Sequence, residues 1–326
     1  MQTKTLGRTG IKVSIIGLGG ANLGLPTSKA PYYQHVDNPE HNAYMVESLG
    51  IATVHAALRR GVTLIDTAPK YGYGMSEQII GKALRMRPNL ARNCMVTTKV
   101  GLVYAGDGFD YSHETTMECM FSSSVRLGME RFSIVYLHDP MDFPMDFVMS
   151  ESGAMGALRE LQRRGIVRYI GIAADEPETA ADYIETGEFD VATVSGAWSL
   201  INQKAAERIL PAARKHNVGI VATTVIERGL LATGKPIPGV RYIQRDFSPE
   251  LLAHVETIDA LCHEFDIPLL AAALQWATRD PQIATAIPGA RTPEEARENA
   301  LAGMMYIPES FWKVLESLIR HFDTRV

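Results

Sequence analysis

Residues 63–100 read TLIDTAPKYGYGMSEQIIGKALRMRPNLARNCMVTTKV and decide the fold class. Two short apolar runs, residues 63–65 and 95–100, stand at the ends of this stretch, and both have the composition of buried parallel strands. Between them, residues 76–86 place their apolar side chains along one stripe of a helix. A strand, a helix and a second strand in this order predict a parallel βαβ unit.

The same alternation continues along the chain. Further strands are predicted at residues 13–18, 134–137, 167–172, 191–194, 220–223 and 283–287. Further helices are predicted at residues 52–60, 115–127, 154–164, 205–215, 249–265 and 308–321. Thr292, followed by Pro293 and Glu295, has the pattern of one more helix N-cap. Gly61, Gly128 and Gly165 follow three of these helices, where glycine enters the left-handed conformation without strain. We therefore predict an α/β fold, a single (β/α)8 TIM barrel of residues 1–326 with its active site at the C-terminal face.

Three long segments interrupt this rhythm, at residues 20–42, 139–152 and 228–247. Each follows a strand and precedes a helix, which places it at the C-terminal face of a barrel, where barrel enzymes bind substrate. Aromatic and methionine side chains in two of them suggest an apolar wall, namely Tyr32, Tyr33, Met141, Phe143, Met145 and Phe147. The alternative fold is a doubly wound sheet, but residues 17–20 (GLGG) match only part of its dinucleotide-binding motif.

The composition is that of a soluble globular protein, with 46% hydrophobic and 21% charged residues. A net charge of −5 and scattered basic residues argue against nucleic acid or an anionic membrane as a partner. We expect neither a signal peptide nor a membrane span. Cys94, Cys119 and Cys262 are too few for a disulfide framework and lack metal-ligand spacing, so a reduced, cytoplasmic protein without a metal is expected.

Four polar residues stand at or just after predicted strand ends, namely Asp66, Tyr71, Lys99 and His138. Each also has an ordinary structural explanation. Asp66 could cap a helix, Tyr71 could be a packing aromatic, and the Lys99 side chain could extend from a strand end into solvent. His138 could simply form a hydrogen bond with the loop backbone. Their convergence on one barrel face instead favours a reactive site. A buried carboxylate and ammonium are unfavourable unless paired, so Asp66 and Lys99 are expected to form an ion pair between neighbouring strands.

Residues 66–77 (DTAPKYGYGMSE), 98–99 (TK), 137–138 (LH) and 287–291 (IPGAR) resemble the aldo-keto reductase superfamily. The resemblance covers essentially the whole chain. Within the superfamily, three further segments resemble the aldose 1-dehydrogenases of the L-fucose/D-threo-aldose and L-galactose dehydrogenase type, with pyridoxal 4-dehydrogenase nearby. These segments are residues 138–140 (HDP), 228–234 (RGLLATG) and 268–275 (PLLAAALQ).

The resemblance implies a role for each of the four polar residues. Tyr71 is the expected general acid/base, Lys99 held by Asp66 lowers its pKa, and His138 orients the substrate oxygen. The expected reaction is hydride transfer between NAD(P) and a small carbonyl or hydroxyl compound, specifically the oxidation of an aldose at C1 to a lactone. An NADPH-dependent aldehyde or ketone reductase is the alternative, and a cofactor-sensing regulatory subunit a third reading.

The resemblance also implies a set of cofactor-binding residues: Gly19, Asp175, Trp198, Thr224, Gly229, Leu231, Pro288, Gly289, Ala290, Arg291, Glu295, Glu298 and Asn299. Trp198 is also a candidate to stack on the nicotinamide and contact substrate, or else an ordinary packing residue. Asp175 is expected to replace the serine and asparagine that bind the carboxamide in many relatives.

The adenosine end of this set departs from the NADP-preferring pattern. Such relatives often carry lysine and arginine at the positions of Gly289 and Glu295. A carboxylate at Glu295 repels a 2′-phosphate, although Arg291 could partly compensate, so NAD is favoured over NADP. The substrate is expected to be a sugar or an aldehyde, and the oligomeric state stays open.

Overall fold

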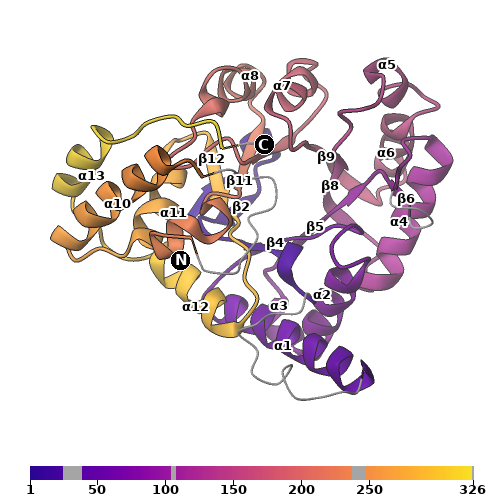
Figure 1. Ribbon diagram of the computed structural model, residues 1–326. Coiled ribbons are helices and arrows are strands. Elements are labelled where there is room, and N and C mark those ends of the chain that lie inside the picture. The colour runs from indigo at the N-terminus through magenta and orange to yellow at the C-terminus, as the bar shows by residue number, and fades with distance from the viewer. Residues whose placement is uncertain (25–38, 104–107, 237–246, 325–326) are drawn as a thin grey trace.

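The computed structural model describes residues 1–24, 39–103, 108–236 and 247–324, without the side chains of 39–46 and 102–103. Eight strands form one parallel sheet at the centre of the molecule, with helices around it (Figure 1). In sheet order they are β12 (Ile283–Ala286), β11 (Gly219–Thr223), β10 (Val191–Ser195), β9 (Val167–Ala173), β8 (Phe132–His138), β5 (Met95–Val100), β4 (Leu64–Asp66) and β3 (Leu18–Gly19).

The two edge strands of this sheet meet, so the sheet closes. Parallel bridges join Ile16 to Ala286 and Gly19 to Gly289, and the Gly17 amide donates to the Ala286 carbonyl at 2.8 Å. Closure removes the unpaired edges that an open sheet exposes. The predicted α/β barrel is confirmed, and the doubly wound alternative is not the fold of this chain.

The strand predicted at residues 13–18 is wrong as one element. Its first part belongs to β2 (Lys12–Ser14), which pairs antiparallel with β1 (Thr3–Thr5), and the barrel strand β3 begins only at Leu18. Leu6 and Val13 pack into the cluster that fills the barrel interior. The hairpin therefore covers the N-terminal end of the barrel, where inward-facing apolar side chains would otherwise meet water.

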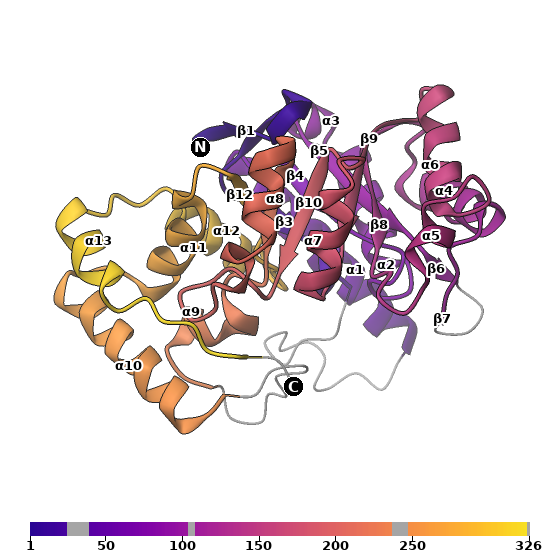
Figure 2. The same cartoon turned by 90° about the horizontal axis from the view of Figure 1, so that it is seen from above.

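Helices surround the barrel. They are α1 (Pro39–Arg59), α2 (Met75–Met86), α3 (Pro88–Ala91), α4 (His113–Leu127), α5 (Met145–Val148), α6 (Ala154–Arg163), α7 (Pro177–Glu185), α8 (Ile209–His216), α9 (Leu230–Thr233), α10 (Pro249–Glu264), α11 (Leu269–Arg279), α12 (Pro293–Ala302) and α13 (Glu309–Glu316). Figure 2 shows α10 and α13 outside α11, an additional layer on that side. Within the described part of the chain, none of these helices has the length and apolar character needed to cross a membrane.

The helix predictions differ from the structure mainly at boundaries. α1 begins at Pro39, so the predicted loop 20–42 is shorter than expected, and its residues 25–38 lie outside the described part, as do residues 237–246 of the loop 228–247. Helices α7 and α11, and the short α3, α5 and α9, were not predicted from the sequence. Gly61, Gly128 and Gly165 adopt the expected positive φ, at 85°, 67° and 69°.

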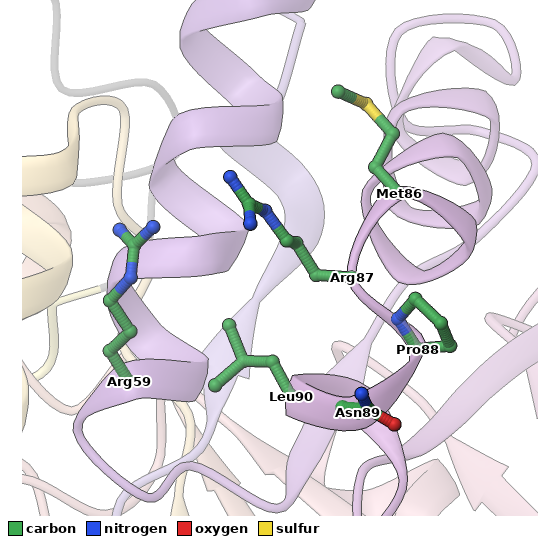
Figure 3. A pocket seen from close by; sticks show the side chains of 6 residues that line it. All are labelled: Arg59, Met86, Arg87, Pro88, Asn89 and Leu90. Carbon is green, nitrogen blue, oxygen red and sulfur yellow. The ribbon is translucent and has the colours of Figure 1, made fainter.

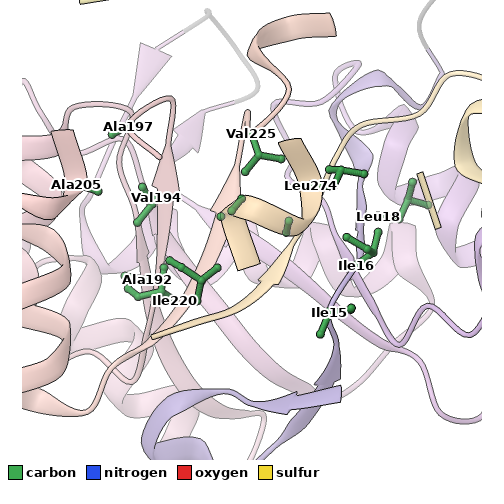
Figure 4. Close-up of a cluster of buried hydrophobic side chains, with 14 of the residues drawn as sticks. Ile15, Ile16, Leu18, Ala192, Val194, Ala197, Ala205, Ile220, Val225 and Leu274 are labelled. Carbon is green, nitrogen blue, oxygen red and sulfur yellow. The ribbon is translucent and has the colours of Figure 1, made fainter. Parts of the chain in front are cut away.

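The alternation of side chains along each strand separates two apolar layers. The barrel interior is filled by a small cluster that includes Leu64, Ile134 and Tyr136. The neighbouring residues face outward into the larger cluster between strands and helices, part of which Figure 4 shows around Val194, Ile220 and Leu274. The parity of a strand residue therefore decides whether its side chain enters the barrel.

Gly171 in β9 makes room for the largest interior side chain. A Cβ atom at Gly171 would lie 2.3 Å from the ring of Tyr136, closer than any real contact. Tyr136 is in turn 1% exposed, with its ring 5.8 Å from the Lys99 ammonium. Because Gly171 in β9 has no side chain, the Tyr136 ring of β8 fits into the barrel interior next to the polar residues at its C-terminal end.

A surface pocket of about 360 Å³ lies at the other end of the barrel, beside the C-terminal ends of α1 and α2. Figure 3 shows the guanidinium groups of Arg59 and Arg87 on either side of it, with Leu90 between their elements. The strands β4 and β5 begin at this end and finish at the opposite one. The pocket is therefore separate from the strand ends that carry Asp66 and His138.

Candidate active site

Strand parity brings three of the four predicted polar side chains into the barrel. Asp66 follows Leu64 by two residues in β4, and His138 follows Tyr136 by two residues in β8, so both face inward. Asp66 and His138 are 4% and 6% exposed, and Lys99 is buried in β5 between them. The sequence places all three near the C-terminal ends of adjacent strands.

Asp66 and Lys99 form the expected ion pair. The Lys99 Nζ lies 2.5 Å from Asp66 Oδ2 and also donates to the Thr67 carbonyl at 2.9 Å. Thr97 Oγ1 donates to the other carboxylate oxygen at 2.7 Å. Desolvation alone lowers the pKa of Lys99, but the Asp66 carboxylate and the neighbouring Tyr71 outweigh it, so this pKa is raised. Lys99 is therefore a fixed, permanently charged ammonium.

Tyr71 lies in the turn between β4 and α2, above this ammonium. The Lys99 Nζ is 4.8 Å from the centre of the Tyr71 ring, and the rings of Tyr71 and His138 are 6.2 Å apart and nearly perpendicular. Desolvation raises the pKa of Tyr71, whereas charge attraction from Lys99 lowers it and Asp66 raises it again. Lys99 thus acts in the expected direction, but the net pKa of Tyr71 is raised, because burial is the larger effect.

His138 is held as a neutral imidazole. Burial lowers its pKa well below 6.5, and the positive charges of Lys99 and Lys70 lower it further, while Asp175 acts in the opposite direction. A neutral imidazole carries one N–H donor and one acceptor nitrogen. The site therefore presents a phenol and an uncharged hydrogen-bonding ring to the same space, with one fixed cation beside them.

Sequence reasoning missed several side chains that surround His138. Lys70 pairs with Asp139 at 3.3 Å, and the Tyr111 hydroxyl donates to the carbonyls of His138 and Asp139. Phe109 lies at the edge of the His138 ring, 6.2 Å between centroids. Lys70 and Asp139 stand next to predicted residues in the sequence, but no local pattern signals that two loops bring them together.

The predicted adenosine-binding residues meet at the seam of the barrel, where β3 lies beside the end of β12. The Gly19 amide donates to the Pro288 carbonyl at 3.0 Å, and Asn299 Nδ2 donates to the Gly289 carbonyl at 3.2 Å. A Cβ at Gly289 would lie 2.6 Å from Asn22 Nδ2, so a close backbone approach is built into this seam. Ala290 is buried beside it.

Helix α12 begins directly after this seam. Thr292 is its N-cap and accepts from the Glu295 amide at 3.2 Å, as predicted. The Glu295 carboxylate accepts from the Arg291 backbone amide at 2.8 Å and from the Arg291 guanidinium at 3.2 Å. Arg291 is therefore already paired with a carboxylate. Glu298 lies exposed on the same helix.

Two further loops carry the other predicted cofactor residues. After β11, Thr224 and Gly229 have φ values of 57° and 107°, and the amides of Gly229 and Leu231 both donate to the Ile226 carbonyl. After β9, the Asp175 amide donates to Asp139 Oδ1 at 3.1 Å. The loops after β9, β11 and β12 thus lie at the same end of the barrel as His138.

A sequence model of the Aldo/keto reductase family matches residues 16–320. The chain belongs to this family. A pyridoxal 4-dehydrogenase from Microbacterium luteolum is 28% identical over 97% of both chains, and a D-threo-aldose 1-dehydrogenase from a Pseudomonas species is 27% identical over 94% of both. Among solved structures, an aldo-keto reductase from Bacillus halodurans in its holo form has a TM-score of 0.77 at 23% identity, covering 98% of this chain and 96% of that one.

Membership of the aldo/keto reductase family makes the chain an NAD(P)-dependent oxidoreductase acting on CH–OH and carbonyl groups of small molecules. The residues at the barrel mouth fit such a cofactor. The N-terminus of α12, with its positive dipole end, suits a phosphate-bearing ligand, and Gly19 and Gly289 let the backbone segments of the seam approach each other closely. In the described ranges, no three His, Cys, Asp or Glu side chains gather closely enough to hold a metal ion.

Trp198 follows the C-terminal end of β10 and packs against α11. Its indole stacks on Trp276 of α11 with 4.9 Å between ring centres, and its Nε1 donates to the Ala277 carbonyl at 3.0 Å. Both contacts fix the ring against the helix layer outside the sheet. This packing fits the alternative explanation of an ordinary packing tryptophan, and stacking on a nicotinamide stays a prediction.

Proposed function

We propose that the protein is a dehydrogenase that oxidises an aldose at C1 to the lactone, with NAD⁺ as the favoured cofactor. The observation that carries this proposal is the buried Lys99–Asp66 ion pair directly beneath Tyr71, with a neutral His138 beside it. The oxidative direction and the sugar substrate are supported by the two similar relatives, both of which are named as dehydrogenases and one as an aldose 1-dehydrogenase.

In this proposal Tyr71 is the general base for oxidation. It accepts the proton of the anomeric hydroxyl, and the positive charge of Lys99 stabilises the phenolate that the group must form first. Asp66 keeps Lys99 charged and pointed at the ring. His138, as a neutral ring, donates a hydrogen bond to the substrate oxygen. A bound nicotinamide would supply the acceptor for the hydride that leaves C1.

The cofactor would be held by backbone and side chains at the seam and loops described above. These are Gly19, Asp175, Thr224, Gly229, Leu231, Pro288, Gly289, Ala290, Arg291, Glu295, Glu298 and Asn299. NAD is favoured over NADP because the Arg291 guanidinium is paired with Glu295 at 3.2 Å and the same carboxylate would face a 2′-phosphate.

The test is a screen of NAD⁺ and NADP⁺ reduction with aldoses and pyridoxal, run in parallel with aldehyde reduction by NADH and NADPH. We expect aldose-dependent reduction of NAD⁺ at a higher kcat/KM than any aldehyde reduction. A larger kcat/KM for an aldehyde with NADPH would replace the proposal with the reductase alternative.

Tyr71→Phe tests the chemistry separately. The variant should lose turnover by roughly 100-fold or more, since it removes the proton acceptor, while cofactor still quenches protein fluorescence. Tyr73→Phe is the matched control, since Tyr73 is two residues away and 71% exposed. Turnover near wild type in Tyr71→Phe would exclude this mechanism.

A further inference from the structure

Asp139 has an unusual backbone conformation directly after His138. Its φ is 49°, in the left-handed region that non-glycine residues adopt at a cost of about 1 kcal/mol. In an extended strand, the side chains of residues 138 and 139 would point to opposite faces. The left-handed turn brings the Asp139 carboxylate back to its neighbour, so that Oδ2 lies 3.4 Å from His138 Nε2.

The Asp139 carboxylate is itself held in place by two other elements. Oδ1 accepts from the Asp175 amide at 3.1 Å, after β9, and Oδ2 lies 3.3 Å from Lys70 Nζ, after β4. The Asp139 side chain is 7% exposed, so its charge is fixed by these partners rather than by water. Its backbone is anchored as well, because its amide donates to the Ala173 carbonyl and its carbonyl accepts from the Tyr111 hydroxyl.

Lys70 joins this arrangement to the proton-handling tyrosine. Lys70 and Tyr71 are consecutive, as are His138 and Asp139, so the ion pair of residues 70 and 139 lies alongside the aromatic pair of residues 71 and 138. Lys70 Nζ also lies 5.1 Å from the centre of the Phe109 ring, which borders His138. The Lys70–Asp139 ion pair therefore joins the loop that carries Tyr71 to the strand end that carries His138.

A negative oxygen beside Nε2 has a definite effect on a neutral imidazole. It attracts a proton on Nε2 and repels a lone pair there, so it favours the tautomer with N–H at Nε2 and the lone pair at Nδ1. The other charges acting on His138 come from Lys99, Lys70 and Asp175. Lys99 and Lys70 disfavour a second proton on the ring, and among the described carboxylates Asp139 is the one that lies within 4.0 Å of a ring nitrogen of His138.

We propose that Asp139 is a positioning residue which, anchored by Lys70 and the Asp175 amide, holds His138 in the Nε2–H tautomer. Its oxygen lies 3.4 Å from Nε2, farther than in an ordinary N–H···O hydrogen bond, so the Nε2 proton stays available to a substrate oxygen. The role of His138 as a donor to substrate rests on the proposed function, whereas the tautomer of its ring does not. Lys70 is a second positioning residue. It lies in the loop that carries Tyr71, and its ammonium neutralises and holds the Asp139 carboxylate.

The decisive experiment is ¹⁵N-detected NMR of the histidine rings in the free protein at neutral pH, combined with kinetics of Asp139→Asn, Lys70→Met and the double variant. The wild type should show His138 as the Nε2–H tautomer, and Asp139→Asn should shift the His138 signals towards Nδ1–H. The kcat should fall by about 10-fold in Asp139→Asn while the cofactor Kd is unchanged. The kcat of Lys70→Met should fall less, because the Asp175 amide still holds the Asp139 carboxylate. The kcat of the double variant should be no lower than that of Asp139→Asn.

Lys204→Met is the matched control, since it removes an exposed lysine paired with Glu207 at 2.7 Å on the surface. It should change neither the His138 signals nor kcat. An Nδ1–H tautomer in the wild type overturns the proposal, and so does an Asp139→Asn variant with unchanged tautomer and kcat. If Asp139→Asn does not fold, Lys70→Met is the deciding variant. The proposal is refuted if Lys70→Met changes neither the His138 signals nor kcat. Absence of any turnover in the wild type would refute the proposed function, while the tautomer measurement would still stand.

Discussion

Lys99 pairs with Asp66 across two strands although the two residues are not register partners. In the β4–β5 ladder Asp66 lies opposite Thr97, and Lys99 stands two residues further along. The lysine side chain therefore reaches back into the barrel to meet the carboxylate at 2.5 Å, and Thr97 binds the second carboxylate oxygen. This offset leaves the ammonium beneath Tyr71 rather than at the open mouth of the barrel.

The first prediction concerns the pH dependence of turnover in Lys99→Met. Burial raises the pKa of Tyr71 above 10 and Lys99 opposes this, so removing the lysine should raise that pKa further. The kcat for alcohol oxidation should rise with pH in the alkaline range in the wild type, and the midpoint should move to higher pH in Lys99→Met, with kcat at neutral pH about 100-fold lower. A midpoint that stays in place would show that Lys99 does not act on the titrating group.

Stability of the same variant provides a second readout. Lys99→Met leaves the buried Asp66 carboxylate without its cation, and breaking a buried pair in this way costs about 3–5 kcal/mol. The double variant with Asp66→Asn removes both charges and should recover most of that loss in urea unfolding, yet remain inactive. Recovery of activity together with stability would mean that the pair serves only the fold.

The third prediction is that the free energy of unfolding decreases at acidic pH because His138 is buried as a neutral ring. Its folded-state pKa lies well below 6.5, so the unfolded chain binds a proton that the folded chain does not. The stability contributed by the neutral ring is complete above pH 6.5 and is lost as the pH falls towards the folded-state pKa. Between pH ~7.5 and ~5, the urea midpoint should fall more in the wild type than in His138→Gln. His263→Gln, at an 82% exposed side chain, is the control and should follow the wild type.

The fourth prediction concerns the preference for NAD⁺ over NADP⁺, which we attribute to the charge of Glu295. Glu295→Gln keeps an acceptor for the Arg291 amide but removes the charge that pairs with its guanidinium. The ratio of kcat/KM for NADP⁺ over NAD⁺ should rise about 10-fold, which corresponds to about 1.4 kcal/mol. Glu294→Gln, an exposed neighbour in the first turn of α12, should leave the ratio unchanged. An unchanged ratio in Glu295→Gln would contradict the assignment of this end of the site.

Gly171 predicts a purely steric effect. In Gly171→Ala the new methyl group meets the Tyr136 ring at 2.3 Å, and overpacking of this kind costs about 1–3 kcal/mol. Urea unfolding should detect the loss. Adding Tyr136→Leu to Gly171→Ala should restore part of it, because the smaller side chain vacates the space. Equal stability of Gly171→Ala and wild type would mean that the strands separate at no cost.

Local sequence was sufficient for the eight barrel strands, although it ran residues 13–18 together, and it located the strand ends that carry Asp66, Lys99 and His138. These features depend on short-range pattern: apolar runs of limited length, and a polar residue at or near the end of such a run. It also gave the cap at Thr292 and the left-handed glycines after three helices, because caps depend on a few neighbouring residues.

Tertiary structure alone decided which side chains meet. Residues 13–18 read as one strand, but the need to cover the barrel floor divides them between a hairpin and β3. The stacking of Trp198 on Trp276, 78 positions along the chain, could not be predicted from local sequence. The Lys70–Asp139 pair depends on two loops and one left-handed residue. Sequence thus determined the chemistry available at each strand end, whereas packing between distant segments determined how those groups are oriented and charged.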